Sequence, residues 1–474
     1  MVLLAFAICV AALPSLLHSP GFDPDIWWHL RSGSWIVSHY SVPRSEPFSW
    51  TMQGKPYVAY TWLFDVMLEW AHRNGHLTGV VVLMVALSAL IFASVFLLIW
   101  ARRKLFLWAL VLTLAVFFAI TPLMTPRPWL FTIWFFTIEL AVLLRVRETG
   151  RTKFLLILPP LFVLWANIHI QFVYGLFTLF LFAVEATLAP MLKERFSMAL
   201  APIPFRATWL AVLSSTLASL VNPYGTALYS VVWEYAHQRA LPLINEFHSP
   251  DFHSPLNFLC VLAVAAVGFN IARRGRQCEP VLIALIAVAC WFAFRSARDT
   301  WFFVIPVAVF ISAPSSNRSE TLSRFQWLGA GGLAVILMLL VAAKQISPSK
   351  LSEPPAQRFP VAACGFVNAT HAKDKIFNSF TWGGYLIWCA PEAHVSMDGR
   401  TNVHGDARVE QSVKTLAGSP EWQTDPDLLR ADIAVIESDS ALASLLHIDH
   451  DFQVIYQDSV GTVFERRREM ASAR

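Results

Sequence analysis

Two aspartates open a polar stretch, GFDPDIWWHLRSG at residues 21–33, that directly follows the first apolar run of the chain. Only a proline separates Asp23 from Asp25, and the residue before a proline favours extended backbone, which predicts both carboxylates on one side. Such a pair can hold a divalent cation such as Mg²⁺ or Mn²⁺, or divide into a general base and a stabilising charge. His29 and Arg31 can contact phosphate. The alternative is a helix that starts at the aspartates and lies on a membrane surface.

Arginines at the borders of apolar runs are the next candidates. Arg127 lies between two prolines in TPRPW, where it either binds a lipid-linked phosphate or extends towards lipid headgroups. Arg295 and Arg298 are three residues apart in RSARD. On a helix they share a face, which predicts a clamp for a phosphate or diphosphate. The alternative is an internal ion pair with Asp299.

Other polar residues also interrupt the apolar pattern. Asn167 and His169 lie in NIHIQ, where the chain turns between two apolar runs. Both are candidate substrate-binding residues, and His169 can also be a ligand or proton carrier. The alternative is that they only form the turn. Glu246 precedes the segment SPDFHSP, in which Asp251 and His253 are close in sequence. A cluster of this kind can coordinate a metal ion or orient a substrate.

The composition places these residues in a membrane protein. The 474 residues are 56% hydrophobic and only 14% charged, whereas soluble domains are about 25% charged. The mean hydropathy of +0.52 agrees with a polytopic α-helical protein. The net charge is small, at +4, and no basic stripe or nucleic-acid-binding module is present. A nucleic-acid partner is therefore not expected.

The apolar runs predict about eleven transmembrane helices. Arginines and lysines concentrate in every second connecting loop, which indicates a cytoplasmic N-terminus and extracytoplasmic polar motifs. The first run lacks a basic segment before it, so we expect a retained helix and not a signal peptide. The runs are 1–17, 79–100, 105–122, 128–144, 154–168, 170–189, 207–221, 256–271, 280–294, 300–313 and 326–343.

The domain division follows from these runs. Residues 1–343 form the predicted membrane domain, with a first extracytoplasmic loop at 18–78, and the Pro- and Ser-rich residues 344–374 form a linker. Residues 375–474 predict a small extracytoplasmic α/β domain. Its expected strands are KIFNSF, YLIWCA, HVSMDG, DIAVIES and FQVIYQDSVGTVFERR, and its expected helices are DPDLLR and SALASLLHI.

Three features of the C-terminal half leave alternatives open. Cys364 and Cys389 form a disulfide if this domain is outside the cytoplasm, or else are free thiols. The segments WGGYLIW (382–388) and MDGRTNVHG (397–405) form either a lid that recognises the acceptor or buried structural turns.

The motifs together resemble those of a known superfamily. DPDIWWHL, TPRPW, WANIHIQF, VNPYG, NSFTWGGYLIW and SMDGRTNVHG, in this order, are similar to those of a group of bacterial polytopic membrane proteins assigned to the GT-C glycosyltransferases. Its characterised members are distant and include oligosaccharyltransferases and protein O-mannosyltransferases. The resemblance covers nearly the whole chain. It implies a GT-C-like fold in a bacterial inner membrane.

The resemblance also implies a function. In that superfamily an acidic motif opens the first outer loop, which here corresponds to Asp23 and Asp25, with Asp25 as the expected base. The donor is a sugar on a polyprenyl phosphate, for which Arg127, His169, Arg295 and Arg298 are candidate ligands. The acceptor is a lipid, glycan or protein. A transporter or flippase of lipid-linked glycans is the alternative, although such proteins favour internal repeats and polar residues at the membrane midplane.

Overall fold

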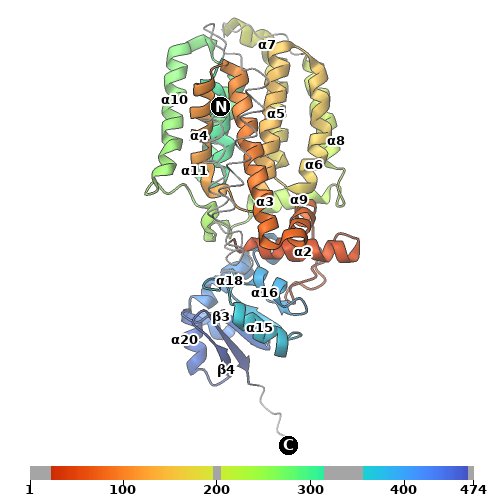
Figure 1. Cartoon of the computed structure of the whole chain (residues 1–474), viewed down its shortest axis with the longest axis vertical. Helices are drawn as coiled ribbons and strands as arrows, with labels where there is room; N and C mark the ends of the chain where they lie inside the picture. Colours follow the sequence, from red (N-terminus) through yellow and green to blue (C-terminus); the bar gives the residue numbers. More distant parts are fainter. Residues whose placement is uncertain (1–22, 196–203, 314–355, 468–474) are drawn as a thin grey trace, which may run out of the picture. The chain divides into compact units, whose positions relative to one another are not determined.

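The computed structural model describes residues 23–195, 204–313 and 356–467 (Figure 1). The chain divides into two compact units. We call the first the helical unit; its described residues are 81–195, 204–226 and 244–313. We call the second the composite unit, because it joins residues 23–80 and 227–243 to residues 356–467.

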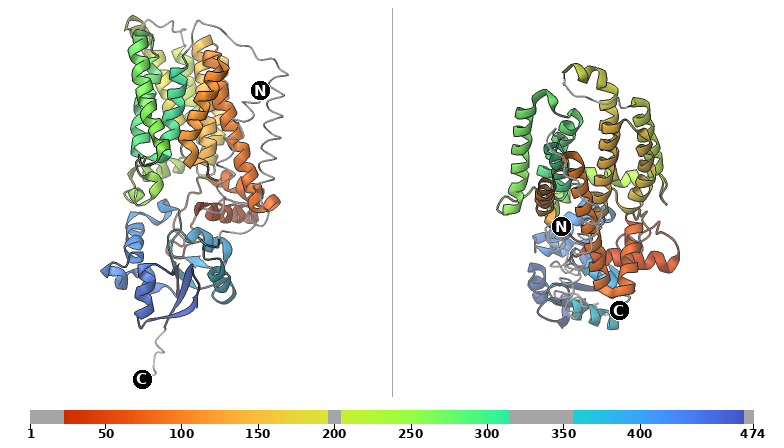
Figure 2. Two further views of the ribbon diagram at one scale, coloured as in Figure 1. Left: turned by 60° about the vertical axis from the view of Figure 1, so that its left-hand side comes forward. Right: turned by 45° about the horizontal axis from the view of Figure 1, so that its top comes forward.

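The helical unit is a bundle of apolar helices that run side by side (Figures 1 and 2). Helix α5 packs against α7, α6 against α8, and α12 against α4, α10 and α11. Its α-helices are the C-terminal part of α3 (Trp62–Arg103), α4 (Phe106–Ile120), α5 (Trp129–Thr149), α6 (Leu158–Ile168), α7 (Phe172–Arg195), α8 (Phe205–Ser219), α10 (Phe258–Arg274), α11 (Pro280–Arg295) and α12 (Thr300–Ile311). Its 3₁₀ helices are η2 (Thr121–Leu123), η3 (Thr152–Ile157), η5 (Asn245–Phe247), η6 (Pro255–Asn257), η7 (Gly275–Gln277) and η8 (Ala297–Asp299).

Each apolar run predicted within the described residues coincides with helical structure. Five of the described segments are long and apolar enough to cross a membrane. The predicted runs 1–17 and 326–343 lie outside the described residues, so the number of about eleven spans stays a prediction. The five segments are Trp62–Arg103, Phe106–Leu123, Trp129–Thr149, Phe172–Leu192 and Pro255–Gln277.

A buried ion network joins several helices at one end of the bundle. Glu279, directly before α11, accepts hydrogen bonds from Arg102 at 2.6 Å and from Arg147 at 2.5 Å. Arg147 also binds Glu185 of α7 at 3.0 Å. Each buried cation therefore has carboxylate partners, which a charge in an apolar interior requires.

The composite unit contains a five-stranded sheet with the order β2-β1-β3-β5-β4. Strand β1 is parallel to β2 and β3, whereas β5 is antiparallel to β3 and β4. The strands are β1 (Lys375–Asn378), β2 (His394–Val395), β3 (Ile433–Glu437), β4 (Phe452–Gln457) and β5 (Gly461–Arg466). The helices are α2 (Asp25–His39), the start of α3, α9 (Ala227–His237), η4 (Leu241–Leu243), α15 (Val361–Thr370), α16 (Gly383–Cys389), α17 (Thr401–His404), α18 (Asp406–Leu416), η9 (Pro420–Thr424), α19 (Pro426–Arg430) and α20 (Ala441–Ile448).

The first loop of the chain is part of the core of this unit. The Trp50 side chain is only 7% exposed and packs among Phe377, Leu442 and Phe464. Its indole N–H donates to the Ile376 carbonyl at 3.1 Å. The predicted outer loop 18–78 is therefore not a separate surface feature: it contains α2 and the start of α3, and it folds together with the C-terminal sheet.

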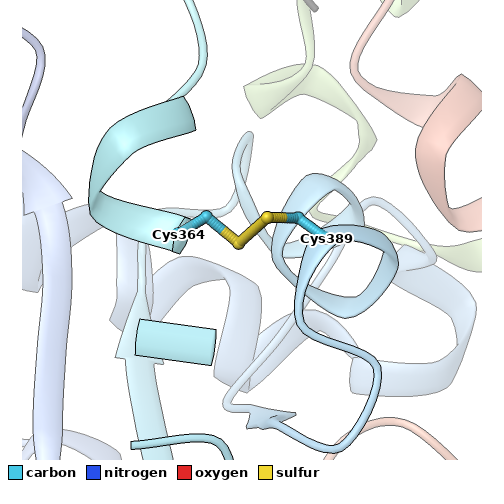
Figure 3. Close-up of a disulfide and its surroundings, with 2 residues drawn as sticks. All are labelled: Cys364 and Cys389. Carbon is cyan, nitrogen blue, oxygen red and sulfur yellow. A yellow bond between two sulfur atoms is a disulfide. The ribbon is translucent and has the colours of Figure 1, made fainter. Parts of the chain in front are cut away.

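Two local expectations for the C-terminal half differ from the structure. The YLIWCA segment was expected as a strand but lies in α16, where its apolar residues pack on both sides of a short helix instead of alternating across a sheet. The predicted linker 344–374 contains α15 at Val361–Thr370. Cys364 of α15 and Cys389 of α16 are joined by a disulfide (Figure 3), which resolves the alternative left open by the sequence.

Candidate functional site

The two aspartates of the first motif lie at the start of α2. Asp23 Oδ1 accepts a hydrogen bond from the Asp25 backbone N–H at 3.0 Å. Pro24 has helical backbone angles, φ −64° and ψ −25°, so the predicted extended Asp-Pro-Asp is wrong. The fixed φ of proline suits a helix start, and here this preference prevails. The helix-start alternative therefore describes the local backbone correctly, with Asp23 bonding an N–H that the helix leaves unpaired.

The Asp25 carboxylate lies against the backbone of the MDGR turn. A side chain on Gly399 would overlap Asp25 Oδ1, so the approach requires glycine at this position. Helix α2 is fixed here by Trp27, whose ring centroid lies 5.1 Å from that of Tyr385 and 4.6 Å from that of Trp388. The candidate base is therefore half-buried and held by packed helices.

His29 and Arg31, predicted as phosphate contacts, both have protein partners. His29 Nδ1 lies 2.6 Å from Asp65 Oδ1, and both side chains are buried. Arg31 donates to the Pro391 carbonyl at 2.9 Å. These contacts tie α2 to α3 and to the C-terminal module. A phosphate role for either side chain stays a prediction.

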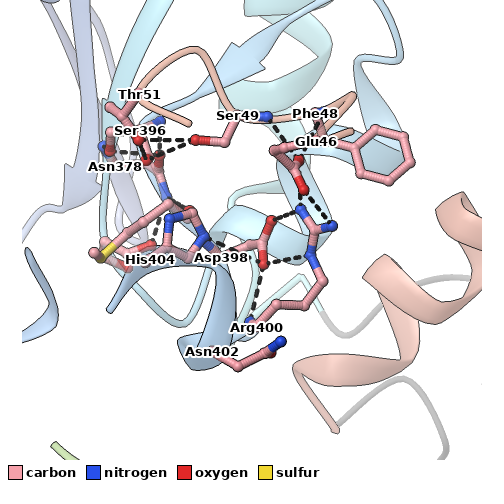
Figure 4. A network of polar contacts seen from close by, with 12 residues as sticks. Glu46, Phe48, Ser49, Thr51, Asn378, Ser396, Asp398, Arg400, Asn402 and His404 are labelled. Carbon is pink, nitrogen blue, oxygen red and sulfur yellow. Dashed lines mark hydrogen bonds and ion pairs between the residues drawn. The ribbon is translucent and has the colours of Figure 1, made fainter. Parts of the chain in front are cut away.

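A second charged group surrounds Arg400 in the MDGRTNVHG segment (Figure 4). The guanidinium donates to both carboxylate oxygens of Glu46 at 2.8 Å and to those of Asp398 at 2.9 and 2.6 Å. His404 Nε2 accepts from the Asp398 backbone N–H at 3.1 Å. Burial by itself would raise the pKa of Asp398, but Arg400 and His404 outweigh it and hold this pKa well below its usual range. We conclude that this segment is a buried structural turn.

The helical unit brings two arginines to one carboxylate. Arg127 Nη2 lies 3.8 Å from Glu246 Oε2, and Arg298 Nη1 lies 3.6 Å from Glu246 Oε1. Both guanidinium groups also lie against the Trp129 ring, at 5.1 and 4.9 Å from its centroid. We call Arg127 and Arg298 the arginine pair. Both distances to Glu246 exceed that of a hydrogen bond, so this carboxylate attracts the pair without bonding either guanidinium group directly.

His169 is close to this pair in the fold. Its Nδ1 lies 2.8 Å from Thr132 Oγ1, and the same hydroxyl accepts from Trp165 Nε1 at 2.9 Å. The His169 side chain is only 1% exposed. The Thr132 hydroxyl therefore fixes the orientation of the imidazole, as a side chain that carries protons or binds substrate requires.

Asp299 connects the arginine pair to the neighbouring helices. It directly follows Arg298 and accepts a hydrogen bond from Gln171 Nε2 at 3.2 Å. Burial raises the pKa of Asp299 to about 6, although Arg298 and the hydrogen bond from Tyr174 oppose the shift. The arginines therefore attract the Asp299 carboxylate, as the ion-pair alternative predicts, but hydrogen bonds from Gln171 and Tyr174 also hold it in place.

Two further predicted residues, Arg295 and Asn167, make other contacts. Helix α11 ends at Arg295 and the backbone is extended at Ser296, so the expectation that Arg295 and Arg298 share a helix face is wrong. Arg295 is exposed and lies over the Trp291 ring at 5.2 Å. Asn167 donates to the carbonyls of Val163 and Val221, at 2.7 and 2.8 Å, which indicates a structural role.

The predicted metal ligands do not form one group. Asp251 and His253 belong to the helical unit, and Asp23 and Asp25 to the composite unit. Asp251 Oδ1 lies 2.7 Å from His253 Nδ1, but these side chains are 70% and 98% exposed. Within residues 23–195, 204–313 and 356–467, no three His, Cys, Asp or Glu side chains are grouped in a way that would hold a metal ion. A divalent cation stays a prediction, and no step below depends on one.

Sequence reasoning did not select Trp129, Thr132 or Glu246 as site residues. Trp129 was visible in TPRPW, two residues after Arg127, and Glu246 was noted only as part of the SPDFHSP cluster. Thr132 gave no signal, because a threonine within an apolar helix is ordinary. The signal for Trp129 was an aromatic ring close in sequence to a lone arginine, whereas the local pattern around Glu246 gave no signal for its contact with the arginine pair.

Comparisons with known proteins support the fold. No family model matches the chain, and no curated protein matches it. Among solved structures, the oligosaccharyltransferase of Archaeoglobus fulgidus is similar in two forms. With a tethered acceptor peptide it has a TM-score of 0.55 and 12% identity, over 91% of this chain and 68% of that one. In the apo form it has a TM-score of 0.54 and 11% identity, over 91% and 69%. This similarity supports a relationship to the GT-C fold.

Proposed function

We propose that the protein is an inverting glycosyltransferase of the extracytoplasmic membrane face, which uses a sugar linked to polyprenyl phosphate. The observation that carries this proposal is the arginine pair. Two cations lie on one indole ring, next to apolar helices, and the Glu246 carboxylate lies beyond hydrogen-bond distance of both. A lipid-linked phosphate offers shorter, charge-assisted bonds to these guanidinium groups and can leave its isoprenoid tail among the helices. The similarity to an oligosaccharyltransferase is consistent with this donor class.

The reaction follows from these roles. An acceptor hydroxyl attacks the anomeric carbon, and the bond from that carbon to the phosphate oxygen breaks. Asp25 takes the hydroxyl proton as general base. Arg127 and Arg298 stabilise the negative charge that develops on the departing lipid phosphate. His169 is the candidate for a further contact to that phosphate or for a proton carrier. A single displacement of this kind inverts the configuration at the sugar.

The test is a transfer assay with the full-length protein in nanodiscs and a labelled polyprenyl-phosphate sugar, offered with lipid, glycan and peptide acceptors. Asp25→Asn should lower the transfer rate by at least about 100-fold, because general-base catalysis contributes about 10²–10⁴-fold. The control is Asp251→Asn, which changes an aspartate that is 70% exposed and should leave the rate unchanged. Parallel reactions with a chelator examine metal dependence.

Two results would contradict the proposal in different ways. Full activity of Asp25→Asn would remove this residue from the mechanism while leaving the transferase intact. The alternative of a transporter or flippase predicts movement of the intact lipid-linked glycan across the bilayer, with no sugar transferred by the wild-type protein. Vesicles that contain the labelled lipid in one leaflet separate these outcomes.

A further inference from the structure

A groove lies between α3 and α5 in the helical unit. It has a volume of about 670 Å³, which is within the range of ligand sites in proteins. Its walls are apolar and include Leu97 and Ala101 of α3 and Ile138 and Ala141 of α5. Small side chains at 101 and 141 leave the space open, and Leu97 is 48% exposed. The groove can therefore accept a flexible apolar chain.

The length of the groove matches one membrane leaflet. Its lining extends along α3 from Ser94 to Arg102 and along α5 from Thr137 to Glu148. At 1.5 Å per residue these stretches are roughly 12 and 16 Å long. Half of a hydrocarbon core of ~30 Å is about 15 Å. The groove is thus as long as the acyl region of a single leaflet is thick.

Two hydroxyl groups that line the apolar part of the groove are hydrogen-bonded to the protein. Thr137 Oγ1 donates to the Ile133 carbonyl at 2.8 Å, and Ser94 Oγ accepts from Trp134 Nε1 at 3.1 Å. Neither hydroxyl needs a water molecule or a polar ligand. An acyl chain can occupy this surface without leaving a buried hydrogen-bonding group unpaired.

Positive charge is concentrated at one end of the groove. The charged residues of the lining are Arg102, Lys104, Arg145 and Glu148, which gives three cations and one carboxylate. Arg102 is occupied, since it bonds Glu279 and Glu148. Lys104 is exposed, and Arg145 is 57% exposed and reaches Glu148 only at 4.0 Å. Two cations are thus placed to receive an anionic group at the end of an apolar channel.

We propose that the α3–α5 groove binds an anionic glycerophospholipid of the surrounding leaflet, with one acyl chain along α3 and α5 and the headgroup phosphate at Lys104 and Arg145. The charge at the end of the groove selects an anionic headgroup over a zwitterionic one. The apolar walls and the one-leaflet length select an acyl chain over a soluble phosphate. The site lies at the end of the helices where the Arg147–Glu279 network is found, and it is separate from the arginine pair. It does not depend on the proposed transfer reaction.

Native mass spectrometry of the full-length protein, released from detergent with added phosphatidylglycerol or phosphatidylcholine, tests the proposal. The wild-type protein should retain one phosphatidylglycerol in preference to phosphatidylcholine. The double variant Lys104→Gln/Arg145→Gln should lower phosphatidylglycerol affinity by about 10-fold or more, because each basic residue near an anionic lipid contributes roughly fivefold. Arg273→Gln removes an exposed charge from the last turn of α10 and should bind as wild type does.

A third variant separates the two halves of the site. Ala141→Phe fills the apolar channel and keeps both cations, so it should also weaken binding of phosphatidylglycerol. Thermal unfolding shows whether each variant is folded. Equal retention of the two lipids by the wild type, or unchanged binding by the double variant, would overturn the proposal. So would preferential retention of polyprenyl phosphate over phosphatidylglycerol, since the groove would then be a site for the donor lipid.

Discussion

Two arginine sites in the molecule use the same chemical groups with different degrees of pairing. In the composite unit, the Arg400 guanidinium is 1% exposed and bonds two carboxylates at 2.6–2.9 Å. In the helical unit, Arg127 and Arg298 share one carboxylate at 3.8 and 3.6 Å, and their side chains are 12% and 16% exposed. At the first site two carboxylates bond one guanidinium group directly, whereas at the second site Glu246 is too distant to bond either guanidinium group directly.

This difference separates a structural role from a binding role. A buried arginine with two bonded carboxylates has no capacity for a further anion, and its loss leaves two buried carboxylates without their cation. Two arginines that Glu246 does not bond directly can turn towards an incoming phosphate, which offers shorter, charge-assisted bonds. The lengths of the ion contacts therefore distinguish the two sites better than residue type does.

Removal of the Arg400 charge should have the largest effect, and it should be on stability. Arg400→Gln leaves Glu46 and Asp398 buried without their cation, which should lower the free energy of unfolding by about 3–5 kcal/mol. Denaturant unfolding followed by tryptophan fluorescence measures the change. Lys414→Gln, at an exposed position of α18, should change it by no more than about 0.5 kcal/mol. Equal stability of Arg400→Gln and wild type would contradict the structural role.

Removal of the Arg298 charge should instead affect activity. Arg298→Gln should lower kcat/KM for the lipid-linked donor by about 100-fold, as is typical for loss of one group that stabilises developing negative charge. The free energy of unfolding should change by less than about 1 kcal/mol, because the Glu246 contact is long and partly exposed. Arg295→Gln is the matched control and should keep nearly full activity. If both variants lose activity equally, the pair is wrongly assigned.

Glu246 should compete with the donor phosphate for the arginine pair. Glu246→Gln removes that competition, so the KM for the donor should fall by about fivefold, which corresponds to ~1 kcal/mol. The measurement is donor-dependent initial rates at low ionic strength, where the effect is largest. A rise in KM would indicate that Glu246 assists binding and would reverse its proposed role.

The Arg400 site should show almost no pH dependence near neutrality. The pKa of Asp398 in the folded state lies below its unfolded value of about 3.9. Its stabilisation is therefore nearly complete above about pH 5 and is lost progressively as the pH falls from the unfolded value towards the lower folded value. The difference in unfolding free energy between wild type and Asp398→Asn should change by less than about 0.5 kcal/mol from pH 7 to pH 5. A marked decrease over this interval would show that the carboxylate titrates there.

The sequence predicted those features that depend on local pattern. The apolar runs gave the helices, and alternating residues gave four segments that contain the five strands. The strand prediction for YLIWCA failed because a short apolar segment fits either a strand or a helix. Packing against α2, which the local sequence does not show, decides in favour of the helix α16. The prediction of an extended Asp-Pro-Asp failed because proline has two opposite preferences. It disfavours helical backbone in the residue before it, but it suits the first turn of a helix, and the second preference prevails here.

The sites were harder to predict, because they depend on contacts between distant parts of the chain. The residue types at Arg127, His169 and Arg298 made them candidates, since lone polar groups at apolar borders are unusual, and their role in a site stays a prediction. The partner Glu246 is distant in sequence from both arginines, and nothing in its local pattern predicts the contact. The same holds for Glu46 and Arg400, which are 354 positions apart.

The position of Trp50 has a consequence for how the protein is made. Its indole bonds to Ile376, which is synthesised 326 residues later. An early segment must therefore wait, with a large aromatic ring exposed, until nearly the entire chain has left the ribosome. The composite unit cannot mature domain by domain from the N-terminus, and truncated chains that end before the sheet should be targets for quality-control proteases.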